Sequence, residues 1–159
     1  MYHLTEGKSK ISRFFDEDLE EHQPFPTLQS ALEILNPFCG FNIEIKWTMK
    51  LLDGSFELQD ALDLNLYVDT ILEVVFKYAD QRRIVFSCFN PDVCTALRYK
   101  QNKYPVLFLT QGDTEKYPRY DDPRCWTVKS GINFVNIIEI LGINAHTEDI
   151  LKDPSVVCY

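Results

Sequence analysis

Three polar side chains alternate with apolar ones between Phe41 and Trp47. Side chains of these chemical types could bind or act on a charged substrate. Asn42, Glu44 and Lys46 fall at every second position, so in a β-strand they share one face of the sheet. A carboxylate can ligate a hard divalent cation, and a nearby ammonium can meet a phosphate oxygen. We therefore take Glu44 as a candidate metal ligand and Lys46 as a candidate catalytic group. The alternative is a solvated face on an edge or antiparallel strand, because charged side chains are mostly exposed.

Further polar residues stand at or just past the carboxyl ends of expected strands, the edge where parallel sheets gather functional groups. They are Ser87, Gln111, Asn144 and His146. We predict that these four contact substrate. For His146, a partly buried ring satisfied by the backbone is favoured over catalysis. Ser87 has no His or Asp at a spacing known to activate a nucleophile.

The elements that must position these residues alternate between helix and strand. Helical spacing of apolar residues predicts helices at about 28–35, 64–79, 91–100 and 132–141, and a helical turn at 148–152. Short apolar or alternating runs predict strands at 41–47, 83–89, 105–110 and 142–146. This alternation indicates βαβ crossovers and a parallel sheet. The alternation alone does not distinguish a doubly wound sheet from part of a barrel. The sequence contains no Gly-rich nucleotide-binding loop, which argues against a nucleotide-binding doubly wound protein.

The composition is that of one globular domain, with 159 residues, 45% hydrophobic and 25% charged. The net charge of −8 argues against nucleic acid as a partner, because binding to a phosphate backbone needs clustered Lys and Arg. No apolar run approaches the roughly 20 residues that cross a bilayer, so we expect no membrane span. We interpret residues 1–24 as a polar lead-in and residues 25–159 as the folded domain.

The five cysteines are odd in number and lack the spacing of a metal site. We interpret them as small buried residues in a reducing compartment, which predicts a cytoplasmic location.

The segment Gly40-Phe41-Asn42-Ile43-Glu44-Ile45-Lys46 resembles the third-strand motif of the glycerophosphodiester phosphodiesterase family. Four more segments resemble its eukaryotic glycerophosphocholine phosphodiesterase branch, and they follow the family's order: residues 23–28, 82–89, 100–112 and 141–149. Together these segments extend over about residues 23–153. Their combination makes the resemblance specific.

The resemblance implies a TIM-type (β/α)₈ barrel, similar in fold to phosphoinositide phospholipase C, with one divalent metal, Mg²⁺ or Ca²⁺. It implies hydrolysis of a small-molecule glycerophosphodiester. For glycerophosphocholine, the products would be glycerol 3-phosphate and choline. By motif match, Glu44 would be a metal ligand, and Lys46 would contact the phosphate or organise that ligand.

Parts of the family pattern are absent from this sequence. The family's first strand ends in His-Arg-Gly and its second supplies Glu-x-Asp, and neither motif occurs in the matching place. The closing strands are also missing, and Trp126-Thr127-Val128, similar to a late family motif, is interpreted as loop. We therefore expect a partial barrel of about strands three to six, with an incomplete metal site. Two functions stay open: part of a metal-dependent phosphodiesterase, or a truncated, inactive fragment that at most binds a partner.

Overall fold

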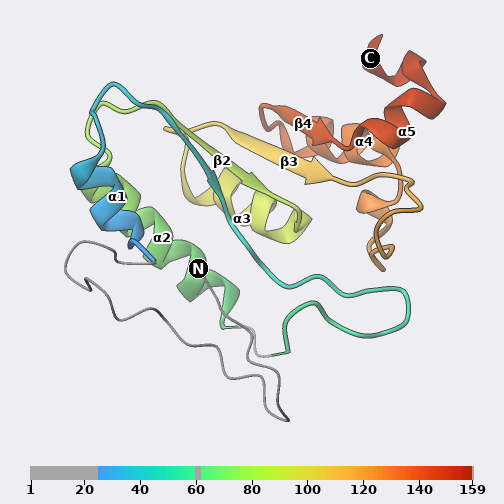
Figure 1. Ribbon diagram of the computed structural model, residues 1–159, viewed down its shortest axis with the longest axis horizontal. Helices are drawn as coiled ribbons and strands as arrows, with labels where there is room; N and C mark the ends of the chain where they lie inside the picture. Colours follow the sequence, from blue (N-terminus) through green and yellow to red (C-terminus); the bar gives the residue numbers. More distant parts are fainter. Residues whose placement is uncertain (1–24, 60–61, 159) are drawn as a thin grey trace, which may run out of the picture.

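The computed structural model describes residues 25–59 and 62–158, and its centre is one parallel sheet. The strands are β1 (Phe41–Glu44), β2 (Ile84–Cys88), β3 (Val106–Thr110) and β4 (Gly142–Ala145). They pair in the order β1-β2-β3-β4, and every pair is parallel (Figure 1). The expected α/β class with a parallel sheet is confirmed. The predicted lead-in, residues 1–24, lies outside the described residues.

Helices precede, separate and follow the strands. They are α1 (Leu28–Ile34), α2 (Leu64–Tyr78), α3 (Pro91–Lys100), α4 (Val128–Ile138) and α5 (Thr147–Lys152), with short 3₁₀ turns η1 (Pro123–Cys125) and η2 (Pro154–Cys158). None of the helices in the described ranges combines the length and the apolar character that a membrane span needs.

The two faces of the sheet differ in burial. Parallel crossovers are right-handed, so an unbroken strand order places the connecting helices on the same face. On the helix-covered face, Phe86 and Phe108 are fully buried, and Phe108 meets Phe134 of α4 edge to face, with ring centroids 5.1 Å apart. On the opposite face, Asn42 and Asn144 are exposed. A doubly wound sheet reverses its order at a switch point, and the described strands show no reversal.

The sheet ends at β1 and β4, which each pair with one strand in the described part of the chain. Consecutive βα units in unbroken order are the repeating unit of a barrel wall. The described strands form such a run without closing on themselves.

Arg82 fixes α1 to the beginning of β2. Its buried guanidinium donates hydrogen bonds to carbonyl oxygens at and just after the end of α1, those of Leu32 (2.9 Å), Leu35, Asn36 and Cys39 (3.1 Å). The last carbonyls of a helix have no partner within it, so Arg82 supplies the bonds that α1 lacks.

The expectation that the cysteines are buried is wrong for Cys39. Its side chain is exposed, whereas Cys88, Cys94 and Cys125 are buried as predicted. Cys39 lies in the turn after Pro37, where its backbone carbonyl, and not its thiol, holds the structure through Arg82.

Two element boundaries also differ from the prediction. The strand expected over 41–47 ends at Glu44, whose Cα partner is Ser87, one residue before β2 ends at Cys88. The cap Asn90 and Pro91 at the first helical position start α3 there. The helix expected from 132 begins at Val128, since Thr127 caps it by accepting the Ser130 N–H at 3.0 Å. Trp126 and Thr127 lie between η1 and α4, as the loop interpretation expected, and Val128 is the first residue of α4.

Candidate active site

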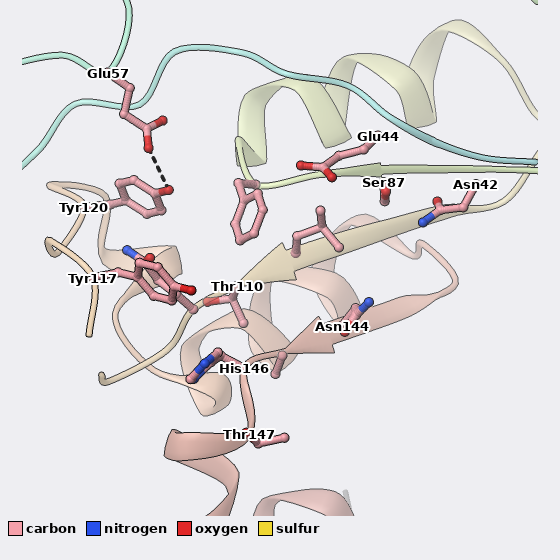
Figure 2. A pocket seen from close by; sticks show the side chains of 14 residues that line it. Asn42, Glu44, Glu57, Ser87, Thr110, Tyr117, Tyr120, Asn144, His146 and Thr147 are labelled. Carbon is pink, nitrogen blue, oxygen red and sulfur yellow. Dashed lines mark hydrogen bonds between the residues drawn. The ribbon is translucent and has the colours of Figure 1, made fainter. Parts of the chain in front are cut away.

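A cavity of about 680 Å³ opens at the carboxyl edge of the sheet. That volume lies within the usual range for small-molecule sites. Figure 2 shows the cavity, with side chains contributed by all four strands or the residues just after them and by two loops. The residues that line it are Asn42, Glu44, Glu57, Ser87, Phe89, Leu109, Thr110, Gln111, Tyr117, Tyr120, Asn144, Ala145, His146 and Thr147.

Glu44 and Ser87 occupy matching positions on β1 and β2, where they are Cα partners. Both face the cavity (Figure 2). Ser87 is fully buried, yet its hydroxyl has no hydrogen-bond partner among the described residues. A buried hydroxyl without a partner is unusual and is a candidate ligand contact.

Lys46 lies beyond the end of β1, and its side chain is 74% exposed. Its ammonium forms an ion pair with the Glu44 carboxylate. Lys46 is not among the residues that line the cavity. The structure therefore brings the two residues together, but only Glu44 faces the cavity.

Gln111, Asn144 and His146 line the same cavity as Ser87, so all four predicted substrate contacts share one site. Gln111 is buried and its Nε2 donates to the Pro118 carbonyl at 2.7 Å, which holds the loop after β3. Asn144 is exposed at the end of β4 and remains available to a ligand.

His146 caps α5 as the N-cap residue. Its Nδ1 accepts the Glu148 N–H at 3.4 Å, so a neutral ring carries its proton on Nε2. The Tyr117 ring meets His146 edge to face, with centroids 5.7 Å apart. The expected backbone partner of His146 is confirmed.

The prediction missed two cavity residues that come from separate loops. The Tyr120 hydroxyl, after β3, donates to Glu57 Oε1, after β1, at 3.0 Å (Figure 2). Burial, and then the Glu57 charge, raise the pKa of Tyr120 above its ordinary value, so the phenol stays protonated as a donor. The two loops also join through Lys50 and Asp121, whose Nζ and Oδ2 lie 2.7 Å apart.

No sequence signal could have found that pair. Glu57 and Tyr120 are 63 residues apart in the chain and lie in loops without a periodic pattern. The alternation of residues 41–47 does place Asn42 on the same strand face as Glu44, and Asn42 lines the cavity.

The described residues do not form a metal site by themselves. In residues 25–59 and 62–158, no three His, Cys, Asp or Glu side chains converge as a metal would require. Of the two carboxylates that line the cavity, Glu44 pairs with Lys46 and Glu57 accepts the Tyr120 hydroxyl. A hard divalent cation prefers six or more oxygen ligands, so this donor set does not fit it.

Comparison with known proteins gives one family. Residues 2–157 match the model of the glycerophosphoryl diester phosphodiesterase family. The chain is 45% identical to glycerophosphocholine phosphodiesterase GPCPD1 of Homo sapiens, over 98% of this chain and 24% of that protein. It is 37% identical to glycerophosphocholine phosphodiesterase gde1 of Schizosaccharomyces pombe, over 84% of this chain and 12% of that protein.

A plant relative also matches most of this chain. The chain is 33% identical to glycerophosphodiester phosphodiesterase GDPD3 of Arabidopsis thaliana, over 94% of this chain and 38% of that protein. The chain thus spans about a quarter of the length of the human relative and a similar or smaller share of several others. No solved structure matches it.

Proposed function

We propose that this chain, which belongs to the glycerophosphoryl diester phosphodiesterase family, supplies one side of the active site of an enzyme that hydrolyses glycerophosphodiesters. The proposed substrate is glycerophosphocholine, the compound in the names of the human and yeast relatives. Water would give its oxygen to phosphorus while the bond from phosphorus to the choline oxygen breaks. The choline oxygen takes a proton, and glycerol 3-phosphate and choline leave.

One observation carries this proposal beyond family membership. Four consecutive parallel strands bring Glu44, Ser87, Gln111 and Asn144 to one cavity at their carboxyl ends. In barrel enzymes the reacting groups come from that edge of several different strands. We propose on this basis that β1 to β4 are about strands three to six of a TIM barrel whose other strands lie outside the described residues.

The chain's own residues have distinct roles in this proposal. Lys46 holds the Glu44 carboxylate through their ion pair and contacts the phosphate from the cavity rim. The free hydroxyl of Ser87 and the Asn144 amide supply hydrogen bonds to the substrate's oxygens. His146, with its proton on Nε2, can donate to an oxygen in the cavity.

A divalent metal, Mg²⁺ or Ca²⁺, belongs to the proposal only as a cofactor of a larger protein. Glu44 would be one ligand, and residues outside the described part would complete the site. Since the described donors do not fit a cation alone, we propose that the 159-residue chain by itself is inactive. We also propose a cytoplasmic location and a folded region over residues 25–159.

A chimera tests the proposal. The matching segment of the human relative is replaced by this chain, and choline release from glycerophosphocholine is measured with Mg²⁺ or Ca²⁺ present. We expect turnover, and a loss of at least about 10²-fold in Glu44→Gln, the size typical of removing one group that stabilises the transition state electrostatically. Glu73→Gln, an exposed change on α2, is the matched control.

Retained turnover in a folded Glu44→Gln chimera would contradict the proposal. Metal-dependent choline release by the isolated chain would contradict its inactivity alone.

A further inference from the structure

We infer that the cavity contains a subsite for a quaternary ammonium group, formed by Glu57, Tyr117 and Tyr120. These residues lie on the loop side of the cavity, apart from the strand-borne Glu44 and Ser87 (Figure 2). The inference rests on the proposed function, because it places the choline end of the proposed substrate.

The charge of Glu57 is the first reason. Within the described part of the chain, no Lys, Arg or His forms an ion pair with Glu57. Its side chain accepts the Tyr120 hydroxyl through Oε1. Glu44, by contrast, is already neutralised by Lys46. Glu57 therefore offers the cavity a negative charge without an ion-pair partner among the described residues, on a carboxylate that Tyr120 holds in place.

The absence of opposing charge is the second reason. None of the described residues that line the cavity is a Lys or an Arg. A cation entering the loop side of the cavity therefore meets a carboxylate and aromatic rings. The lysines beside these rings, Lys116 and Lys46, stand outside this lining, although Lys46 lines an adjoining pocket together with Glu57.

The aromatic rings are the third reason. The face of a Tyr ring attracts a cation whose charge lies within about 6 Å of the ring centroid. Two exposed lysines outside the cavity lining show this geometry: Lys116 Nζ lies 5.1 Å from the Tyr117 centroid, and Lys46 Nζ lies 6.0 Å from the Phe89 centroid. A ligand cation on Tyr117 would take the place of the Lys116 ammonium. The described part of the chain places no such cation over Tyr120.

A carboxylate combined with tyrosine rings favours a quaternary ammonium over a primary ammonium. A quaternary ammonium cannot donate a hydrogen bond, so it needs apolar contact around its methyl groups and a negative charge close by. Tyrosine faces with one carboxylate meet both needs. A primary ammonium would instead need several hydrogen-bond acceptors directed at it.

Binding of choline to the 159-residue chain tests the inference without turnover, because the subsite consists of this chain's own residues. NMR titrations compare choline with 3,3-dimethyl-1-butanol, its uncharged carbon analogue. We expect choline to bind about tenfold more tightly than the analogue. Glu57→Gln keeps an acceptor for Tyr120 and removes only the charge, and Tyr117→Leu removes an exposed ring. Each should bring the ratio close to one.

The controls are Glu73→Gln on α2 and Tyr99→Leu, an exposed ring on α3, which should leave the ratio unchanged. Equal binding of choline and its analogue, or an unchanged ratio in Glu57→Gln, would overturn the inference. The proposed function fails separately, when the chimera does not hydrolyse glycerophosphocholine although the chain binds choline selectively.

Discussion

Glu44 and Ser87 are Cα partners on adjacent strands, which places a carboxylate next to a buried hydroxyl that has no hydrogen-bond partner in the described structure. The fold gains nothing from that hydroxyl, since a buried polar group without a partner costs free energy. Its position at the carboxyl edge of the sheet fits a role toward a ligand. Measuring the stability of substituted chains can distinguish a role in the fold from a role toward a ligand.

Ser87→Ala should leave the free energy of unfolding unchanged or slightly raised, because no hydrogen bond of the described residues is lost. Thr110→Val is the matched comparison. Thr110 is equally buried at the end of β3, but its hydroxyl donates to the Cys125 carbonyl at 3.3 Å and accepts the Gly112 N–H at 3.0 Å. That substitution should cost about 1–3 kcal/mol. Urea denaturation measures both, and an equal loss in the two variants would refute the assignment of Ser87.

Arg82→Ala should lower the free energy of unfolding by about 2–4 kcal/mol, since it leaves the carbonyls at the end of α1 without their donors. The neighbouring Arg83 is exposed, and Arg83→Ala should change stability by less than about 0.5 kcal/mol. Thermal unfolding compares the two. A similar small change in both variants would show that the buried guanidinium does not hold α1.

Gly112→Ala should destabilise the chain through two separate effects. Gly112 has φ +60°, which disfavours any side chain, and an added Cβ would lie 2.5 Å from Asp149 Oδ2. That oxygen accepts the Val128 N–H at 2.7 Å, at the start of α4. We expect a loss of about 2–4 kcal/mol.

Gly54→Ala isolates the first of these effects. Gly54 has φ +86°, but nothing lies within 4 Å of an added Cβ. We expect a loss of about 1 kcal/mol there. Equal losses in the two variants would show that the contact with Asp149 does not matter.

Asp122 should make stability depend on pH in the acid range. Burial alone would raise the pKa of Asp122, but hydrogen bonds from Arg124 hold it below its ordinary value of 3.8. A carboxyl whose folded pKa is depressed stabilises the fold above its unfolded pKa, and that contribution is lost as the pH falls below about 3.8 toward the folded value.

Asp122→Asn should therefore reduce stability at pH 7 and flatten the decline of the unfolding temperature below about pH 4. Glu73→Gln, which changes a carboxylate outside the described ion pairs, is the control. A decline that is as steep in Asp122→Asn as in the parent chain would contradict this account.

The features that the sequence predicted well depend on local chemistry. Asn90-Pro91 predicted the start of α3, and the structure has Asn90 as the cap and Pro91 as the first helical residue. The same reasoning overlooked Thr127 with Ser130, so it placed the start of α4 too late. The strand face with Asn42 and Glu44 was found because its period of two is visible in the sequence.

The features that the sequence did not predict depend on contacts between distant segments. β1 pairs with the distant β2 and ends at Glu44, so Lys46 lies past the strand end, although its ammonium still pairs with Glu44. Arg82 reaches carbonyls more than 40 residues earlier, and Tyr120 reaches Glu57 across two loops. Neither contact leaves a pattern in the residues around it.

The Arg82 anchor and the cavity lie at opposite ends of the strands. Arg82 precedes β2 and holds α1 near the amino end, whereas Glu44 and Ser87 stand at the carboxyl end. Amino-acid changes should therefore be tolerated better at the carboxyl end of the strands than at the amino end. Loops at the cavity end can vary and retune what the protein recognises, while the amino end keeps the architecture constant.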